Sequence, residues 1–137
     1  MSIEANKALV WQYLKLYNGA DLAIVDTVIS PDFIDHMHPE QERGPAGVKH
    51  ALGLFRAAFS DIRYQVEHMI GEGDIVAFRF RLEALHRGPF AGLAPTGRRV
   101  TLTGMDFVRI ENGQIVELWS CQDTLDWVAQ LGGKLVV

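Results

Sequence analysis

The feature that most constrains the fold of this chain is a pair of extended runs, residues 98–111 and 114–123, joined by Asn112 and Gly113. Asn-Gly between two runs of strand-forming residues is the strongest short-range signal for a β-hairpin, because both residues tolerate the positive φ angles of a type I′ turn. The sequence therefore predicts two antiparallel strands near the C-terminus, around which the rest of the chain is arranged.

Two aspartates interrupt the apolar character of these strands. Side chains alternate along a strand, so Trp119 and Asp123 point to one face, and we expect that carboxylate to lie in an apolar pocket. Asp106 is out of pattern too, so it must be protonated, face a polar cavity or pair with an arginine such as Arg79 or Arg81. A two-residue turn puts Asp106 opposite Trp119 and near Asp123, whereas a bulge shifts the pairing by one residue. The register decides whether the two carboxylates act together.

The rest of the chain predicts helices that cover one face of a sheet. Apolar residues recur at helical spacing in four segments, which are residues 2–18, 21–30, 45–59 and 124–131. Alternation with a period of two predicts strands over residues 62–70 and 76–86, in addition to the hairpin. A short extended run at residues 33–37 is placed at an edge of the sheet. We expect a single α+β domain over residues 1–137.

Charge and composition exclude several classes of partner. The chain has 137 residues and a formal net charge of −4, and its Lys and Arg residues are not clustered, which argues against nucleic acid and against an anionic membrane surface. No apolar run approaches the length of a membrane span, and the first residues lack the pattern of a signal peptide. The single cysteine, Cys121, rules out an internal disulfide and fits a reducing compartment. We therefore expect a cytoplasmic protein.

Three segments of the chain resemble the SnoaL-like polyketide cyclase (ester cyclase) family of the nuclear-transport-factor-2-like superfamily. They are residues 33–36 (Phe-Ile-Asp-His), the loop 88–97, and residues 109–123 with the closing Gln-Leu-Gly at 130–132. The resemblance covers nearly the whole chain. It implies a cone-shaped fold, in which a curved mixed or antiparallel sheet is covered by three N-terminal helices. It also implies a pocket for a polycyclic or otherwise bulky apolar molecule between the sheet and the helices.

The family resemblance also implies a reaction and a base. Such cyclases close a ring by an intramolecular aldol reaction without metal or cofactor, and use an aspartate as general base, which matches Asp123 here. Removing a carboxylate from water raises its pKa, as a base working near neutral pH requires. Asp123 is also well placed to cap the helix that follows it. Asp106 is the second candidate, since two nearby carboxylates split their pKa values and can serve as acid and base.

Two histidines and four apolar side chains complete the expected site. His36 matches a histidine common in the family, and His86 directly precedes the Gly- and Pro-rich loop. Either one can hydrogen-bond a substrate carbonyl, orient the aspartate, or serve a purely structural role. The pocket wall is expected to include four apolar residues, Trp119, Phe90, Phe33 and Met105.

Metal and nucleophile chemistry find little support in the sequence. His36 and His38 lie two residues apart, as metal ligands on a strand do, but no third ligand follows at a recognisable spacing. Cys121 has no evident base beside it, so we interpret it as a small packed side chain. The sequence has no phosphate-binding glycine loop, no Gly-x-Ser-x-Gly elbow and no Cys-x-x-Cys pair.

Two further functions remain open beside the cyclase. A limonene-type epoxide hydrolase, or a hydratase or isomerase, would use Asp106 and Asp123 as paired acids, although Gly104 stands where that enzyme's Asp-Arg-Asp arrangement has arginine. A non-catalytic ligand-binding module would turn both aspartates to solvent. The resemblance also implies a homodimer formed through the outer, more polar face of the sheet, which carries Arg79, Arg81, Glu83, Thr101, Thr103 and Phe107.

Overall fold

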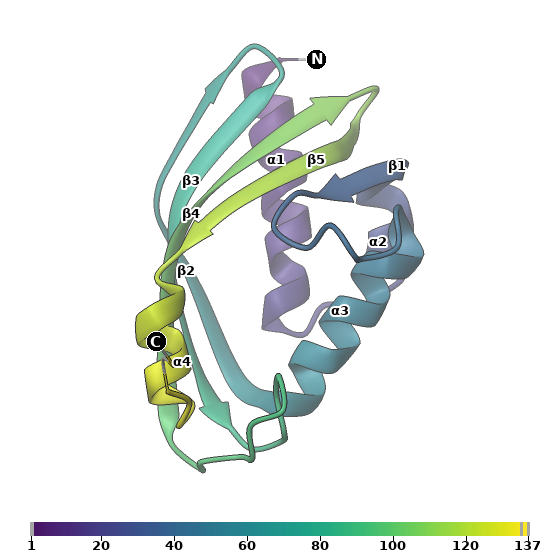
Figure 1. The fold of residues 1–137 in the computed structure, drawn as a ribbon. Helices are drawn as coiled ribbons and strands as arrows, with labels where there is room; N and C mark the ends of the chain where they lie inside the picture. The colour runs from purple at the N-terminus through teal and green to yellow at the C-terminus, as the bar shows by residue number, and fades with distance from the viewer. Residues whose placement is uncertain (1, 135, 137) are drawn as a thin grey trace.

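The computed structural model of the protein describes residues 2–134 and 136. Four α-helices, one 3₁₀ helix and five strands follow one another as α1 (Ile3–Leu14), η1 (Lys15–Asn18), α2 (Ile24–Val28), β1 (Ile29–Asp35), α3 (Pro45–Ala58), β2 (Phe59–Glu72), β3 (Ile75–His86), β4 (Arg99–Glu111), β5 (Gln114–Gln122) and α4 (Thr124–Gln130) (Figure 1). This is the α+β arrangement that the sequence predicts.

The five strands form one mixed sheet in the order β1-β5-β4-β3-β2. Strands β2 to β5 are an antiparallel meander, and β1 pairs in parallel with β5 at the edge. The three longest strands, β2, β3 and β4, bend along their length, so that the sheet is curved (Figure 1). The expected strand near residues 33–37 is therefore confirmed as an edge strand.

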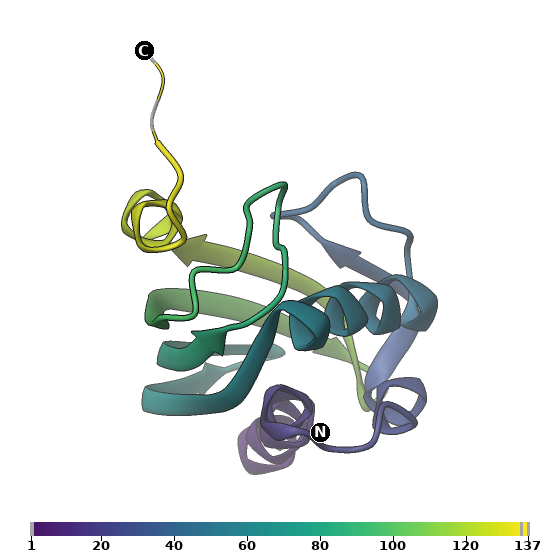
Figure 2. The ribbon, with the colours of Figure 1, turned by 90° about the horizontal axis from the view of Figure 1, so that it is seen from below.

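The N-terminal helices cover the concave face of this sheet. Seen from below, α3 lies across the open side with α1 beside it, while α4 and the loop 87–97 stand together at one end (Figure 2). Helix α3 begins at Pro45, whose missing N–H needs no partner at this position. The preceding Gly44 has a φ of 82°, and a Cβ there would lie 2.7 Å from the carbonyl oxygen of Pro31, so glycine is required. None of the helices in the described residues has the length and apolar character needed to span a bilayer.

The second helix is shorter than the sequence pattern predicts. Helix α2 spans only Ile24–Val28, and the segment that was expected to complete it is the first part of β1, which contains Pro31. Proline is tolerated there because β1 is an edge strand, where one side of the backbone needs no ladder hydrogen bonds. Ile29, fully buried, pairs with Ile115 of β5 instead of continuing the helix.

A β-bulge in β5 sets the register of the hairpin. The pairing begins as a two-residue turn requires, with Ile110 opposite Ile115, but Arg109 then pairs with Glu117. Val116 is therefore the extra residue of the bulge, and every pair beyond it is shifted by one. As a result Asp106 lies opposite Ser120, not opposite Trp119.

The bulge also decides which side chains face away from the helices. Trp119 pairs with Phe107, and the two side chains are 37% and 56% exposed on the outer face of the sheet. Met105 is exposed beside them, and so is Cys121. The predictions that Trp119 and Met105 line the pocket, and that Cys121 is packed, are therefore wrong. Alternation identified residues that share a face, but both faces of this hairpin carry apolar residues, so the pattern could not tell which face is covered.

Candidate active site

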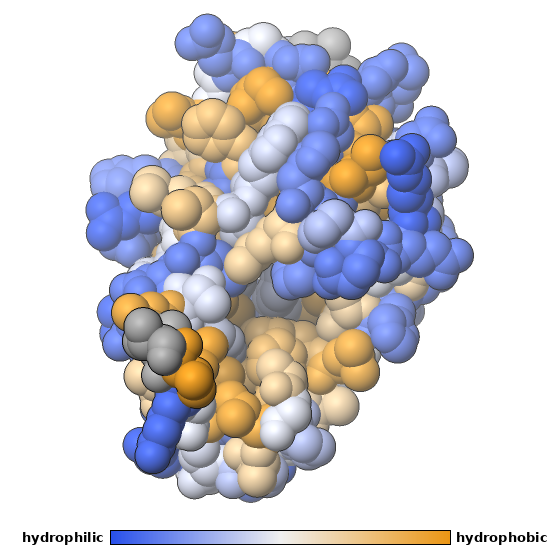
Figure 3. Space-filling view, in the orientation of Figure 1, coloured by the Kyte–Doolittle hydropathy of each residue, from blue (hydrophilic) through white to orange (hydrophobic). Residues whose placement is uncertain are grey.

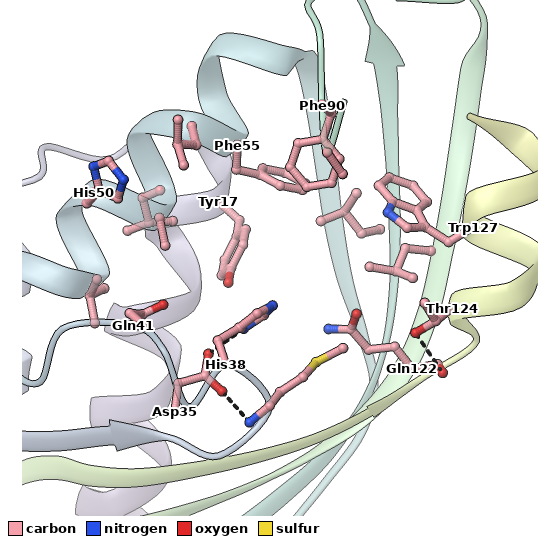
Figure 4. Close-up of a pocket in the computed structure, with 18 of the residues that line it drawn as sticks. Tyr17, Asp35, His38, Gln41, His50, Phe55, Phe90, Gln122, Thr124 and Trp127 are labelled. Carbon is pink, nitrogen blue, oxygen red and sulfur yellow. Dashed lines mark hydrogen bonds and ion pairs between the residues drawn. The ribbon is translucent and has the colours of Figure 1, made fainter. Parts of the chain in front are cut away.

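A cavity of about 670 Å³ lies between the concave face of the sheet and the helices. Figure 3 shows the molecule hollowed at this place, with apolar surface below the opening and polar surface above it. Aromatic side chains from separate elements form much of the wall, among them Phe33 and Phe80. Figure 4 shows three others, Phe55, Phe90 and Trp127, around the same cavity. Phe33 and Phe90 were predicted to line such a pocket, and both do.

Asp106 lies on the floor of this cavity, on β4. Its side chain is only 7% exposed, and Oδ1 accepts a hydrogen bond of 2.5 Å from the hydroxyl of Ser120. Burial raises the pKa of the Asp106 carboxyl to about 6; the Ser120 hydrogen bond lowers it, and the negative charge of Asp35 raises it further. The arginines expected as possible partners are occupied elsewhere, because Arg79 pairs with Glu67 and Arg81 with Glu83. Asp106 is therefore a carboxylate held in an apolar cavity.

Two residues of β5 hold the Asp106 carboxylate in place. Nε2 of Gln122 donates a hydrogen bond of 3.1 Å to Oγ of Ser120, and the Ser120 hydroxyl donates its own hydrogen bond to Oδ1 of Asp106. Because one oxygen of Asp106 is fixed by these two hydrogen bonds, the second oxygen is available for a substrate. The sequence did not reveal this hydrogen-bond network, since only the bulge at Val116 puts Ser120 and Gln122 on the inner face.

Three tyrosines stand around the same carboxylate. The hydroxyls of Tyr13 and Tyr17 lie 3.4 Å apart, and the ring of Tyr17 stacks on that of Tyr64 with centroids at 5.1 Å. Burial raises the pKa of Tyr17 to about 12, and it raises the pKa of Tyr13 and Tyr64 as well; the negative charge of Asp106 adds to the shift in each case. The three hydroxyls stay protonated and can donate hydrogen bonds. In the sequence these tyrosines look like ordinary core aromatics.

A second carboxylate, Asp35, enters the cavity from the end of β1 together with His38. Oδ2 of Asp35 accepts a hydrogen bond of 3.1 Å from Nδ1 of His38, and Oδ1 accepts one of 2.9 Å from the backbone N–H of Met37. Figure 4 shows the His38 ring directed into the cavity below Tyr17. His38 was considered only as a metal ligand, and Asp35 only as part of a family motif.

The two histidines named from the sequence lie elsewhere. His36 is on the outer face, where its ring stacks on Trp119 and Nε2 lies 2.8 Å from Oε2 of Glu117. His86 is fully buried behind the cavity wall, and its Nδ1 accepts a hydrogen bond of 3.1 Å from the backbone N–H of Thr96. Neither histidine lines the cavity. His86 instead fastens the loop 87–97 to the end of β3.

His36 and His38 do not form a joint site, because each pairs with a different carboxylate on a different side of the sheet. Within residues 2–134 and 136, no group of three or more His, Cys, Asp or Glu side chains is placed to hold a metal ion.

Asp123 lies outside the cavity lining and is exposed. Its side chain accepts a hydrogen bond of 3.3 Å from the backbone N–H of Asp126, so it is the N-cap of α4. The expectation that Asp123 lies in the pocket with Trp119 is wrong, although the capping role considered beside it is correct. Paired catalysis by Asp106 and Asp123 has no support in this geometry. The carboxylate whose charge raises the pKa of Asp106 is Asp35.

Comparison with known proteins agrees with this architecture. The model of the SnoaL-like polyketide cyclase family matches residues 7–131. TsrD from Streptomyces laurentii superposes with a TM-score of 0.90 at 25% identity, over 98% of this chain and 99% of that one. AclR, a candidate hydroxylase from Streptomyces galilaeus, gives a TM-score of 0.81 at 29% identity, over 99% and 86% of the two chains.

A further solved structure, that of IdmH, a candidate polyketide cyclase from Streptomyces antibioticus, gives a TM-score of 0.76 at 29% identity, over 93% of this chain and 98% of that one. None of the curated proteins matches the chain significantly. The family model covers most of the chain, and the fold agrees with the solved relatives. The chain belongs to the SnoaL-like polyketide cyclase family.

Proposed function

We propose that this protein is an enzyme that works without a cofactor and takes a proton from a carbon next to a carbonyl group, with Asp106 as the general base. This is the first step of an aldol-type ring closure. One observation carries the proposal: the buried carboxylate of Asp106, with its pKa raised to about 6, lies on the floor of a cavity whose walls are largely aromatic and aliphatic. The cyclase family and the candidate polyketide cyclase among the relatives support the same type of chemistry.

The state of Asp106 suits this role. With a pKa of about 6 the carboxyl is roughly nine-tenths ionised at pH 7, so it is ready to accept a proton. It is also a stronger base than an exposed aspartate, because burial destabilises its charged form. A base whose pKa lies near the working pH contributes about 10²–10⁴-fold to the rate.

The tyrosines supply the complementary function. When the proton leaves carbon, negative charge develops on the carbonyl oxygen, and hydroxyl donors in a water-poor cavity stabilise it. Tyr17 lines the cavity close to Asp106, and its raised pKa keeps the proton on oxygen. Tyr13 supports it through the contact between the two hydroxyls.

The cavity favours a bulky, mostly apolar substrate. A volume of about 670 Å³ is in the range of sites for drug-sized ligands. The aromatic walls of Phe55, Phe90 and Trp127 suit flat rings, which stack well on such surfaces. We therefore infer a polycyclic or polyketide-like carbonyl compound as the class of substrate.

We also propose that the protein forms a homodimer through the outer face of the sheet. Met105, Phe107 and Trp119 leave large apolar side chains exposed side by side on β4 and β5. A contiguous apolar surface of this kind is typical of a protein interface. A second copy related by a twofold axis would cover it with the same residues.

The base is tested with a simple carbon acid, 2-tetralone, which is a bicyclic ketone with acidic protons between its carbonyl and its aromatic ring. In D₂O at pH 7, proton NMR follows the replacement of these protons by deuterium. We expect the protein to accelerate the exchange above the buffer rate, and Asp106→Asn to lower the acceleration by at least about 100-fold.

Asp123→Asn is the matched control, because it removes an aspartate outside the cavity and keeps a good helix cap. It should exchange 2-tetralone at the wild-type rate. The assignment of the base fails if Asp106→Asn exchanges 2-tetralone at the wild-type rate.

A further inference from the structure

A second proton-transfer group is built into the wall of the same cavity. The turn after β1 brings His38 back against Asp35, with the backbone N–H of His38 donating to the carbonyl oxygen of Asp35 at 3.1 Å. The Nδ1 atom of the same histidine is 3.1 Å from Oδ2 of that carboxylate. Backbone and side chain therefore fix His38 together, although half of its side-chain surface is exposed at the cavity mouth.

We propose that His38, oriented by Asp35, donates a proton to the carbonyl oxygen of the substrate while Asp106 takes the proton from the neighbouring carbon. This inference rests on the proposed function, because it assigns the acid that complements the base. His38 touches the substrate in this scheme, whereas Asp35 is a positioning residue.

The orientation of the imidazole follows from the hydrogen bonds of Asp35. Both carboxylate oxygens are occupied, one by the N–H of Met37 and the other by Nδ1 of His38. A carboxylate only accepts, so Nδ1 carries the proton and Nε2 is left for the cavity. Figure 4 shows the ring pointing inward from the turn, toward the space below Tyr17.

The position of His38 relative to Asp106 suits a substrate held between them. Asp35 ends β1, Gln122 ends β5 and Asp106 lies on β4, and these strands are neighbours in the order β1-β5-β4. Asp35 pairs with Leu118 of β5, and Ser120, two residues further along the same face of β5, lies opposite Asp106. Asp106 and His38 both line the cavity. A flat ketone held in the cavity between these two residues would present its carbon to Asp106 and its oxygen to His38.

The charge of the cavity favours histidine as the acid. Among the described residues that line the cavity there are four carboxylates and neither lysine nor arginine. A protonated imidazole next to Asp35 is compensated by the negative charge of that carboxylate. The tyrosines donate hydrogen bonds to the developing charge but keep their protons, since burial raises their pKa values.

The proton balance of the step is simple. The carbon–hydrogen bond breaks, and its proton binds to the free oxygen of Asp106. The electron pair moves to the carbonyl oxygen, which takes the proton of Nε2 and leaves His38 neutral. In ring closure the enol carbon then attacks a second carbonyl carbon, the first carbonyl re-forms, and the enol O–H returns its proton to Nε2 of His38. Protonated Asp106 gives its proton to the new alkoxide, so both residues return to their starting states. No oxidant or reductant takes part.

Replacement of His38 by alanine, with added imidazole, tests the proposal. In the 2-tetralone exchange assay we expect His38→Ala to lower the maximal rate by at least about 10-fold with little change in KM. Millimolar imidazole should restore much of this rate by entering the space that the side chain leaves. His50→Ala is the matched control, because His50 also lies at the mouth of the cavity and makes no hydrogen bond to Asp35.

Asp35→Asn separates positioning from proton transfer. We expect a smaller loss of rate, because His38 is still present but is held less firmly, and imidazole should not restore it. Loss of activity in His38→Ala that imidazole leaves unchanged, or a change confined to KM, would show a structural role and overturn the proposal.

The two proposals fail differently. An inactive Asp106→Asn together with a fully active His38→Ala removes only the assignment of the acid. An active Asp106→Asn variant rules out Asp106 as the base. A wild-type protein that does not exchange 2-tetralone above the buffer rate contradicts both proposals.

Discussion

The hydroxyl of Ser120 lies 2.5 Å from Oδ1 of Asp106, across the pair of strands that forms the floor of the cavity. The contact stabilises the ionised carboxylate and opposes the effect of burial on its pKa. It exists because the bulge at Val116 brings Ser120, and not Trp119, opposite Asp106. The most informative variants of this protein follow from that one relationship.

Removal of the Ser120 hydroxyl should shift the pH dependence of proton abstraction. In the wild type the rate of 2-tetralone exchange should rise with pH through about 6, as Asp106 ionises. In Ser120→Ala the stabilising hydrogen bond is lost, so the pKa of Asp106 rises and the same limb moves to higher pH. The measurement is the exchange rate from pH 4.5 to 8.5. Cys121→Ala, which changes the next residue on the outer face, should leave the limb in place, and an unmoved limb in Ser120→Ala would contradict the expectation.

Replacement of Asp106 by asparagine should stabilise the fold at neutral and higher pH. The folded state holds a proton on Asp106 up to about pH 6, whereas the unfolded chain releases it near the ordinary 3.8. Between these values the folded state binds more protons, so the contribution of Asp106 to stability falls as pH rises, and the full cost is present above about pH 6. At 1.36 kcal/mol per pH unit this cost is roughly 3 kcal/mol.

Denaturant unfolding of wild type and Asp106→Asn at pH 4 and pH 8 measures this effect. The variant should gain stability relative to the wild type mainly at pH 8, by about 1–3 kcal/mol, because asparagine carries no charge to bury. An equal difference at both pH values would mean that the carboxylate is not destabilised by burial. Such a stability gain with loss of activity is typical of a residue kept for function.

Removal of the Tyr17 hydroxyl should slow the reaction without moving its pH limb. Tyr17→Phe keeps the ring that stacks on Tyr64 and contacts Phe55, so the fold and substrate binding should persist. The developing oxyanion loses a donor, and we expect the maximal rate of 2-tetralone exchange to fall by about 10-fold or more. The KM, the rate and the thermal midpoint of unfolding are measured together. A variant with the wild-type rate would remove Tyr17 from the oxyanion site.

A charge on the outer face should dissociate the proposed dimer. Phe107→Glu puts a carboxylate in the middle of the apolar surface that Met105 and Trp119 complete, and burying it between two copies costs several kcal/mol. Light scattering after size exclusion should show the wild type at twice the mass of the chain and the variant at the single mass. Leu125→Glu, on the exposed side of α4, is the control and should remain dimeric. A monomeric wild type would contradict the dimer proposal.

Most of the secondary structure was predictable from the sequence because it depends on local patterns. The helical period from Pro45 onward, the alternation in β3 and the Asn112-Gly113 turn each report on a few neighbouring residues, and each element forms where expected. The second helix is the exception, because Ile29 gains more by pairing with β5 and being fully buried than by continuing a short helix.

The sequence also marked Asp106 as unusual, since an aspartate on an apolar strand face needs a special environment. It could not identify that environment. The choice between Asp106 and Asp123 as the buried carboxylate depended on one inserted residue, Val116, whose side chain is taken up by the core. Local patterns do not predict a bulge, because its cost is local whereas its benefit comes from packing against distant elements.

The alternation of β5 therefore determined that Trp119, Cys121 and Asp123 share a face, and only the tertiary structure decided that this face is the outer one. The same holds for the cavity, where Asp35 and His38 meet the surroundings of Asp106 through the parallel pairing of β1 with β5, a contact between segments some 80 residues apart. Side-chain alternation is a property of each strand, but which of its faces is buried is set by the helices that cover the whole sheet.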